Sequence, residues 1–550
     1  MTLLELAQLA VLDEVAQGAD EITRSRLAAT VRATEEGEAF QTAVCRLLGG
    51  SRDAWEAAAQ SLARSLSSRP GITSAVASNG FVTFELDGSV ILEHATRRML
   101  SEALGVRSVL AGRQQVTDAS TPLNVGRFHA GHLRAAFLAD CLGQVSLFLG
   151  STNRHQDHVG NCSVEIGAAL LLASRRGVGH GARPAAFTDL LHASSGELKA
   201  DAEFAAGARR QVRDLQAGVA EPSIKRLADT LSDNYRRERG SLFDALGLDR
   251  LSTAFILEST LLHEVPLAVH ELQTLSVTDP RGAVTITSRT QRTRCGPVRL
   301  TLVKSDGLFG YDSFDVALLR RRLREKGTNT ILTVVSGAQA KRMELVRHAA
   351  QSVGWLGSGD DFVVVDHAPV AGPSTDGARR PPLPALELVK GVAAELERST
   401  EHSNPVKRAS GVWRFALDAV RFHMLQHDRR HALIVAPESV ITSAFALRRL
   451  QASASGHARA LDSDRTISPA LGLGPVACAC IIEADRFESV LVKTLEQAEP
   501  AILARYLMSL AKRADRLSVD SEPWGSGERT AAALAAATLS AGLGILGISS

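Results

Sequence analysis

The spacing of apolar residues changes along the chain and separates segments of different predicted structure. Residues 1–70 repeat their apolar positions with a helical period, and the sequence from Gly71 then alternates apolar and polar residues around Asn79 and Gly80. An Asn-Gly pair between two alternating segments is typical of a tight β-hairpin turn. We therefore predict a separate α+β domain over residues 1–112.

A strand, a loop and a helix are predicted in succession after this domain. The segment QQVTDAS, which starts at Gln114, is a short strand candidate that ends in a Ser-Thr-Pro loop. From Gly131 as far as Val145, apolar residues recur at helical spacing. This succession predicts the first part of an α/β domain over residues 113–385.

Further strands of that domain are predicted at residues 284–290, 298–306, 330–337 and 361–369, with helical patterns between the later ones. Strands that alternate with helices are typical of a Rossmann-like parallel sheet. A charged helical segment from about Asp201 to Arg250 interrupts the alternation. The expected fold class is therefore α/β, with an insertion in the parallel-sheet domain.

The C-terminal part of the chain, residues 386–550, has an almost purely helical pattern and is predicted to form an all-α bundle. Its most apolar segment, residues 530–550, is rich in Ala, Ser, Thr and Gly, which favours a bundle helix over a membrane span. The N-terminal segment carries acidic residues within its apolar pattern, unlike a secretory signal. These features predict a cytoplasmic protein that is not associated with a membrane.

Composition narrows the function classes only slightly. The net charge of +2 indicates no overall basic field, although positive charge can still gather on one face that binds nucleic acid. The six cysteines are scattered, which is typical of reduced thiols inside a cell. His423, His427 and His431 share one helical face but have no thiolate or carboxylate partners at convincing spacing. We interpret them as a solvated or RNA-facing surface and predict no metal site.

The segment STPLNVGRFHAGHLR, which starts at Ser120, places two histidines around a glycine where the predicted strand leads into the predicted helix. A helix N-terminus offers backbone N–H groups and a positive dipole to an anion, so phosphate binding is the expected chemistry. Gly131 lacks a Cβ and lets a flat ligand approach the backbone, while His129 and His132 supply hydrogen-bond donors. Such donors stabilise the charge that develops on an attacked phosphate.

This segment resembles a signature of the class I aminoacyl-tRNA synthetases, in the form found in arginyl-tRNA synthetases. The match extends to residues on both sides of the histidines: Ser120, Thr121, Pro122, Phe128, Leu133 and Arg134. The resemblance implies a Rossmann-like catalytic domain that uses ATP and Mg²⁺. It assigns ATP binding to Ser120, Pro122, His129, Gly131 and His132, and catalytic roles to the last three of these.

A second similarity to that family covers LVKSDGLFGYDSFDVALLRRRL, which starts at Leu302. Tyr311 and Asp315 hold the places of a substrate-binding tyrosine and aspartate, and residues four apart on a helix share one face. A carboxylate binds a guanidinium through charge-assisted, often bidentate hydrogen bonds. The resemblance therefore implies arginine, or another amino acid that bears a guanidine group, as a substrate. Further substrate contacts are implied at Asp118, Asn124 and Gln339.

The cations with which the family neutralises the departing pyrophosphate are changed in this chain. Family members carry a lysine in a mobile signature loop, or a compensating lysine just before the first signature histidine. This chain has Arg127 before the histidine, and Arg379 and Arg380 in the loop region. We expect Arg127 or Arg379 to replace the lysine, although a planar guanidinium differs from the point charge of an ammonium group.

The implied substrate pocket departs from the family pattern as well. Asn124 lies one residue after the position of the family's asparagine, and Asp118 stands where the family has a longer glutamate. Residues 158–167, HVGNCSVEIG, occupy the place of a segment that usually contains G-D-W-G-x-Q-x-G. Three alternatives therefore stay open: an arginine–tRNA ligase, a paralogue that aminoacylates a small molecule in a biosynthetic pathway, and a non-catalytic tRNA-binding module.

The first alternative predicts a two-step reaction of protein biosynthesis. ATP activates the amino acid as an aminoacyl-adenylate while His129 and His132 stabilise the transition state, and the aminoacyl group then passes to tRNA. The segment NGFVTFEL from Asn79 resembles the end of the family's tRNA-binding appended domain. The segment ALDAVRFHMLQHDRR from Ala416 resembles the entrance to its anticodon-binding domain. Both flanking domains are therefore expected to bind tRNA.

Overall fold

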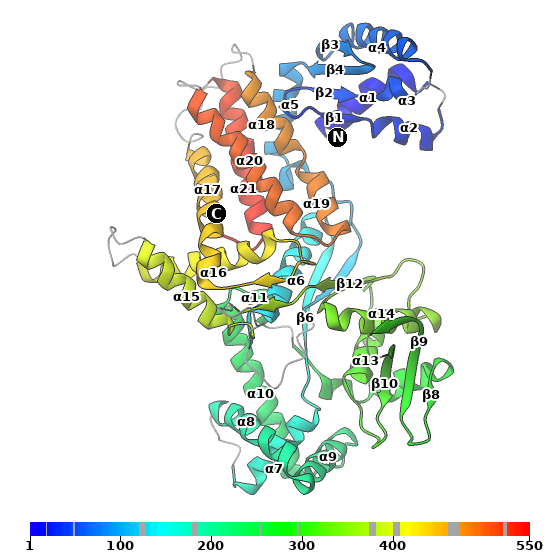
Figure 1. Ribbon diagram of the computed structural model, residues 1–550, viewed down its shortest axis with the longest axis vertical. Coiled ribbons are helices and arrows are strands. Elements are labelled where there is room, and N and C mark those ends of the chain that lie inside the picture. The colour runs from blue at the N-terminus through cyan, green and yellow to red at the C-terminus, as the bar shows by residue number, and fades with distance from the viewer. Residues whose placement is uncertain are drawn as a thin grey trace. The chain divides into compact units, whose positions relative to one another are not determined.

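The computed structural model describes residues 1–17, 19–47, 50–119, 128–178, 184–252, 255–293, 296–372, 381–399, 408–459, 473–520 and 525–549. Contacts within the chain define two units. The first consists of residues 1–108 and 445–550, and the second of residues 109–444. Figure 1 shows the helices and strands of both units.

The first unit contains a four-stranded antiparallel sheet with the strand order β1-β2-β4-β3. Asn79 and Gly80 join β3 to β4 with φ angles of 51° and 75°, the left-handed conformations that a two-residue hairpin turn requires. The predicted hairpin is therefore confirmed. The strands are β1 (Val31–Ala33), β2 (Phe40–Thr42), β3 (Ile72–Ser78) and β4 (Phe81–Leu86). The accompanying helices are α1 (Leu3–Val15), α2 (Glu21–Ala28), α3 (Val44–Leu47), α4 (Arg52–Ser67) and α5 (Gly88–Leu100).

C-terminal helices complete the first unit, and the helical character predicted for this part of the chain is confirmed. Asp485 is buried and accepts hydrogen bonds from Arg98 Nη1 at 2.5 Å and from the backbone N–H of Leu3 at 2.6 Å. His94 Nε2 lies 2.7 Å from the same carboxylate. This buried cluster ties the two ends of the chain into one unit. The helices are α18 (Pro475–Asp485), α19 (Phe487–Glu496), α20 (Ala501–Asp520) and α21 (Ser526–Ile545).

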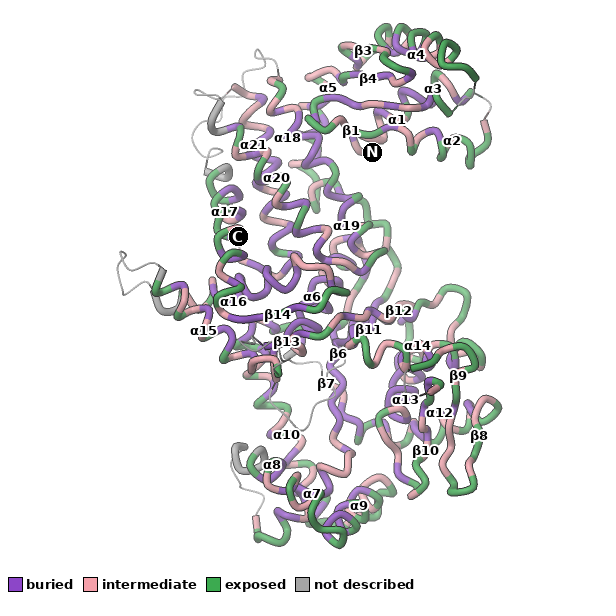
Figure 2. Tube along the Cα trace, viewed as in Figure 1, coloured by how far each residue is buried: buried purple, intermediate pink, exposed green. Residues whose placement is uncertain are grey.

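The second unit is built around a five-stranded parallel sheet with the strand order β12-β11-β5-β6-β7. The middle strands are largely buried (Figure 2), as is typical of parallel sheets on which helices pack. The predicted Rossmann-like parallel sheet is confirmed. Its strands are β5 (Gln114–Asp118), β6 (Thr152–Val159), β7 (Phe255–Leu257), β11 (Thr330–Ser336) and β12 (Asp361–His367).

A helical insertion separates β6 from its neighbour β7 in the sequence. Its helices are α7 (Val164–Arg175), α8 (Pro184–Ala200), α9 (Ala202–Gln216), α10 (Pro222–Ala245) and α11 (Asp249–Ser252). Leu170 and Phe204 belong to an apolar core that α7, α8, α9 and α10 share. The predicted insertion is confirmed, and it begins earlier than expected because α7 is mostly apolar and lacks the charged pattern of the later helices.

Two of the predicted strands do not join the parallel sheet, and this part of the sequence-based prediction is wrong. The strands β8 (Val277–Thr278), β9 (Val284–Thr293) and β10 (Gly296–Val303) form a separate antiparallel sheet. Only two residues separate β9 from β10. A parallel pair needs a crossover of about a dozen residues or more, so this connection allows only a hairpin.

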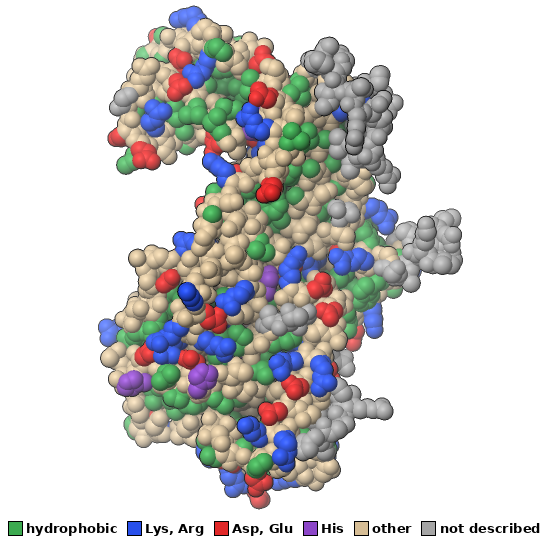
Figure 3. Space-filling view, turned by 180° about the vertical axis from the view of Figure 1, so that it is seen from behind, with side chains coloured by type: hydrophobic (Ala, Val, Ile, Leu, Met, Phe, Trp, Pro, Cys, Tyr) green, Lys and Arg blue, Asp and Glu red, His purple; other side chains and the backbone are tan. Residues whose placement is uncertain are grey.

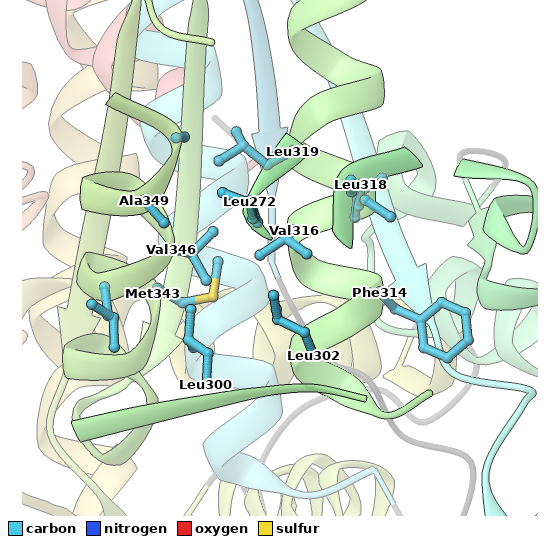
Figure 4. Close-up of a cluster of buried hydrophobic side chains, with 14 of the residues drawn as sticks. Leu272, Leu300, Leu302, Phe314, Val316, Leu318, Leu319, Met343, Val346 and Ala349 are labelled. Carbon is cyan, nitrogen blue, oxygen red and sulfur yellow. The ribbon is translucent and has the colours of Figure 1, made fainter. Parts of the chain in front are cut away.

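A dense apolar core fixes this hairpin against helices of the second unit. Figure 4 shows Leu300 and Leu302 of β10 among side chains of the neighbouring helices, including Val316, Met343 and Val346. The helices are α12 (Glu264–Glu271), α13 (Tyr311–Arg324) and α14 (Gly337–Ser352). Since α13 and α14 both carry functional candidates at their first turns, this core holds those turns in place.

Helix α6 (Ala130–Phe148) packs on β5, β6 and β11 and is fastened at its N-terminal end by Arg134. This buried arginine donates hydrogen bonds to the carbonyl oxygens of Asp428 at 2.9 Å, His431 at 3.0 Å and Ala368 at 3.3 Å. Those residues flank the short parallel pair β13 (Val370–Ala371) and β14 (Leu433–Ile434). The remaining helices are α15 (Ala385–Ser399), α16 (Arg408–Gln426) and α17 (Pro437–Arg459).

The surface agrees with the small net charge. On the face shown in Figure 3, Lys and Arg side chains are interspersed with Asp and Glu side chains. Within the described ranges, no helix is long and apolar enough to cross a membrane. The division into three domains with boundaries after residues 112 and 385 stays a prediction.

Candidate active site

A cavity of about 910 Å³ lies at the carboxyl ends of β11 and β12, where open parallel sheets bind their ligands. The start of α6, the end of β10 and the first turns of α13 and α14 also contribute to its walls. Residues with functional side chains in the lining include His129, His132, Lys304, Tyr311, Asp315, Gln339 and Arg342. The histidine pair and the predicted substrate contacts of α13 and α14 therefore share one cavity.

The two histidines are held by the backbone at the start of α6. His129 is the N-cap residue, and its Nδ1 accepts the backbone N–H of Gly131 at 3.1 Å. His132 Nδ1 accepts the backbone N–H of His129 at 3.3 Å. Because each Nδ1 is an acceptor, the proton of each neutral ring lies on Nε2. Both rings therefore keep an N–H donor.

Burial keeps both rings neutral. It lowers the pKa of His129, and it lowers the pKa of His132 to about 3 with further contributions from His129, Arg239 and His367. The two rings stack with their centroids 3.6 Å apart, a distance at which two imidazolium cations would repel each other strongly. The site therefore offers neutral hydrogen-bond donors at pH 7.

Gly131 lies so close to the His129 ring that a side chain at this position is disfavoured. A Cβ built on this residue would lie 3.0 Å from Cε1 of His129. This is tighter than ordinary van der Waals contact, so a side chain here would require the imidazole ring to shift by a few tenths of an ångström.

Arg239 supports the histidines from the insertion, a contribution that sequence analysis missed. Its guanidinium lies 5.5 Å from the ring centroid of Phe128 and 4.8 Å from that of Phe243, and its Nε donates to Asp157 at 2.5 Å. Phe128 in turn lies 5.5 Å from the ring of His132. The only hint in the sequence was the charged pattern of α10, which is equally typical of a solvated helix.

Tyr311 and Asp315 lie one turn apart on α13 and both line the cavity, so they do share one face of the helix. Asp315 is 7% exposed and Tyr311 is 49% exposed. Burial, together with the nearby carboxylates of Glu165 and Glu258, raises the pKa of Tyr311 to about 12. Its phenol therefore stays protonated and can donate a hydrogen bond. Gln339, in the first turn of α14, lines the same cavity.

Residues 97–369, which include almost the whole lining of this cavity, match the family of tRNA synthetases class I (R), catalytic domain. The chain belongs to the class I tRNA synthetases. The parallel sheet, the histidine pair on α6 and the first turn of α13 all lie within the matched catalytic domain. The family resemblance of these segments is thereby confirmed.

Relatives named arginine–tRNA ligase match most of the chain. The protein from Frankia casuarinae is 26% identical over 510 residues, which span 86% of this chain and 85% of that protein. The one from Thermosynechococcus vestitus is 26% identical over 527 residues, with 86% of each covered. Their matches extend well beyond the catalytic domain.

Solved structures of arginyl-tRNA synthetases share the fold. The enzyme from Plasmodium falciparum aligns with a TM-score of 0.74 at 16% identity and covers 94% of each chain. The enzyme from Thermus thermophilus aligns with a TM-score of 0.71 at 17% identity, covering 100% of this chain and 99% of the other. At this level of identity the likeness establishes the fold and not the roles of individual residues.

Asp118 of this synthetase, the last residue of β5, lies in a buried ion pair away from the cavity lining. Arg322 of α13 donates hydrogen bonds from Nη1 to the Asp118 carboxylate at 2.8 Å and from Nε to Gln156 at 2.7 Å. The structure thus brings Asp118 together with an arginine of the same chain, and not with Tyr311 and Asp315. Its contact with a substrate guanidinium stays a prediction.

The segment 158–167, which departs from the family pattern, lies behind Asp315. His158 is buried, with its Nδ1 3.6 Å from the Asp315 carboxylate and its Nε2 3.9 Å from Glu258. Glu258 also accepts the backbone N–H of Cys162 at 3.1 Å, and burial raises the pKa of Glu258. Within this segment His158 lies beside Asp315, and no residue of the segment belongs to the cavity lining.

Several predicted positions, namely Ser120, Pro122, Asn124, Arg127 and Arg379, lie outside the described residues, and their roles stay predictions. His423 is buried and its Nδ1 lies 2.8 Å from Ser443 Oγ, so interpreting it as solvated or RNA-facing was wrong. A helical period alone does not say which face a neighbouring helix covers. Among the described residues, no group of three or more His, Cys, Asp or Glu side chains is placed to hold a metal ion.

Proposed function

We propose that this protein is an arginine–tRNA ligase, which activates arginine with ATP and transfers the arginyl group to tRNA. The observation that carries the proposal is one cavity that combines the neutral His129 and His132 with Tyr311 and Asp315. The names of the relatives that match 86% of the chain support both the amino acid and the acceptor.

In the first step, a carboxylate oxygen of arginine attacks the α-phosphorus of ATP in line. A new O–P bond forms, the bond from the α-phosphorus to the bridging oxygen breaks, and pyrophosphate leaves. His129 and His132 donate their Nε2–H groups to the α-phosphate oxygens, on which negative charge accumulates in the transition state. Because burial keeps both rings neutral, they donate without first having to be protonated. Magnesium enters with the substrate as MgATP.

The departing pyrophosphate needs a cation in place of the usual lysine. Arg127 and Arg379 are proposed for this role from their places in the sequence. Lys304, which follows β10 and lines the cavity, adds an ammonium group that sequence analysis treated only as part of a motif. A lysine at this point supplies a compact positive charge of the kind that stabilises pyrophosphate.

Asp315 and Tyr311 are proposed to select the side chain of arginine. The Asp315 carboxylate is nearly buried, where a charge-assisted hydrogen bond to a guanidinium is strongest. The Tyr311 phenol, at the first residue of α13, lies on the same face. Gln339 and, from their positions in the sequence, Asn124 and Asp118 are proposed as further contacts.

In the second step, a hydroxyl of the terminal ribose of tRNA attacks the carbonyl carbon of arginyl-adenylate, an ester forms and AMP leaves. The first unit has a surface pocket of about 420 Å³ lined by Arg46, Trp55, Asn79 and Phe81, among others. The Arg46 guanidinium lies 4.0 Å from the centre of the Phe81 ring. Aromatic rings, an arginine and an amide suit an unpaired nucleotide, so we propose this pocket as a tRNA contact.

The retained cavity favours this function over the non-catalytic alternative, which has no use for two half-buried, neutral histidines in one cavity with Tyr311 and Asp315. The relatives' matches reach well outside residues 97–369, into segments that are proposed to bind tRNA. This extent supports tRNA over a small molecule as the acceptor. A reaction that consumes ATP and charges tRNA for protein biosynthesis is assigned to the cytoplasm.

The test is aminoacylation of total tRNA with radiolabelled arginine, run beside a panel of other amino acids. Arginine alone is expected to be incorporated, and the double variant His129→Ala, His132→Ala is expected to lose this activity. The tRNA must be present throughout, so that activation that depends on tRNA is not missed. Incorporation of a different amino acid, or none by folded protein that binds tRNA, would contradict the proposal.

A further inference from the structure

Arg342 of α14 forms ion pairs with Asp312 and Asp315, the two carboxylates of α13 that face the cavity. A single nitrogen, Nη1, donates to Asp312 at 2.6 Å and to Asp315 at 2.5 Å. All three side chains belong to the cavity lining. A guanidinium paired with carboxylates is the interaction proposed above for an arginine substrate, and here a residue of the chain itself provides it.

The second carboxylate oxygens of the two aspartates have different surroundings. The second oxygen of Asp312 accepts the backbone N–H of Thr301 at 2.7 Å, and the second oxygen of Asp315 lies 3.6 Å from His158 Nδ1. The Asp312 carboxylate therefore keeps a hydrogen bond in the absence of Arg342, and the buried His158 remains beside Asp315. A guanidinium that enters the cavity meets a preformed site in which Arg342 already lies.

The charge of Arg342 does not vary under physiological conditions. The negative charge of Asp315, followed by that of Asp312, raises the pKa of Arg342 above the ordinary value of arginine. The two aspartates and Arg342 together carry one negative charge in place of two. The attraction between these aspartates and a cationic substrate is correspondingly reduced.

We infer that Arg342 is a specificity-determining residue of the amino-acid site, an internal guanidinium that competes with the guanidinium of the substrate for Asp312 and Asp315. Arginine binds fully only when Arg342 releases or shares these carboxylates. The affinity for arginine is therefore lower than the carboxylates alone would provide. This inference rests on the proposed function, because it takes Asp315 as the contact of the substrate side chain.

The packing of α14 does not depend on this arginine. Apolar side chains such as Met343 and Val346 fasten the helix to the core shown in Figure 4. Arg347, on the same helix, offers a matched control, because it makes a partly exposed ion pair with Glu344 at 2.8 Å outside the cavity lining. A variant at position 342 is therefore expected to fold.

The experiment measures the affinity for L-arginine by calorimetry and the KM for arginine in tRNA charging, for the full chain and three variants. Arg342→Met keeps the length of the side chain without its charge and is expected to bind arginine about tenfold more tightly, or about 1.4 kcal/mol. Arg342→Lys keeps the positive charge on a shorter side chain, which holds the charge farther from the two carboxylates, and is expected to give an intermediate value. Arg347→Ala is expected to match the unaltered protein.

Equal or weaker arginine binding by Arg342→Met and Arg342→Lys, in protein with an unchanged thermal transition, overturns the inference. It would show that Arg342 organises the carboxylates for the substrate. Calorimetry needs no catalysis, so the proposed function is judged separately. If Arg342→Met binds arginine more tightly while neither it nor the unaltered protein charges tRNA, the competition is supported and the ligase activity is refuted.

Discussion

His129 and His132 stack with their ring centroids 3.6 Å apart, and the Nδ1 of each ring accepts a hydrogen bond from a backbone N–H at the start of α6. The stacking and the burial both disfavour the addition of a second proton, on Nδ1, which would make either ring a cation. The pair is therefore a fixed set of neutral Nε2–H donors. In the proposed reaction it stabilises charge on phosphate without exchanging protons.

Replacing either histidine is expected to lower kcat for tRNA charging by about 100-fold, since removing one preorganised donor to developing charge costs on the order of 10²–10³. The affinity for arginine measured by calorimetry should change little, because Asp315 and Tyr311 are untouched. The variants are His129→Ala and His132→Ala, and His348→Ala, an exposed histidine on α14, is the control. Equal kcat values for all of these proteins would rule out the donor role.

The stability of the second unit is expected to fall as the pH is lowered from about 6.5 towards 4. Burial lowers the pKa of His132 to about 3, and of His367 and His423 to about 4, from an ordinary value of 6.5. In that pH range these three histidines bind protons in the unfolded chain but stay neutral in the folded chain, so lowering the pH favours unfolding.

Urea unfolding at pH 7.5, 6.0 and 5.0, monitored with a probe placed in the second unit, measures this loss of stability. The variant His367→Gln should show a smaller drop in midpoint between pH 7.5 and 5.0 than the unaltered protein. An identical drop in both would mean that other groups cause it.

Arg239→Ala is expected to reduce kcat by about tenfold, since the loss of its contact with Phe128 leaves the ring beside His132 less well positioned. It should also destabilise the protein, because it removes a buried ion pair with Asp157. Arg237→Ala, at a more exposed position of α10, is the control. Steady-state kinetics and thermal unfolding give the two effects, and an unchanged kcat would leave Arg239 with a structural role only.

Lys304→Ala is expected to lower kcat by about tenfold or more if its ammonium group stabilises the departing pyrophosphate. Lys304→Arg should recover part of the rate, since it restores the charge but not its compact shape. Lys326→Ala, an exposed lysine after α13, serves as the control. Rates of ATP–pyrophosphate exchange with tRNA present measure the effect, and similar rates in all three variants would assign the role to Arg127 or Arg379 alone.

Several features were predictable because they depend on residues close together in the sequence. Asn79 and Gly80 supply the left-handed backbone of a hairpin turn, and the four-residue spacing of Tyr311 and Asp315 puts them on one helical face. The hairpin of β9 and β10 was misassigned because apolar alternation indicates a strand but not its partner. The predicted strands, 284–290 and 298–306, left only seven residues between them, too few for a crossover to a parallel partner, and this short gap would have corrected the assignment.

The sequence by itself therefore determined the local elements, the histidine pair at a helix N-terminus and the family to which the chain belongs. Only the tertiary structure decided what those groups contact: Arg322 beside Asp118, Arg239 beside Phe128, and Arg342 between Asp312 and Asp315. Each of these contacts joins different segments of the chain. Such pairings follow from the strand order and the packing of helices, which no local spacing of residues encodes.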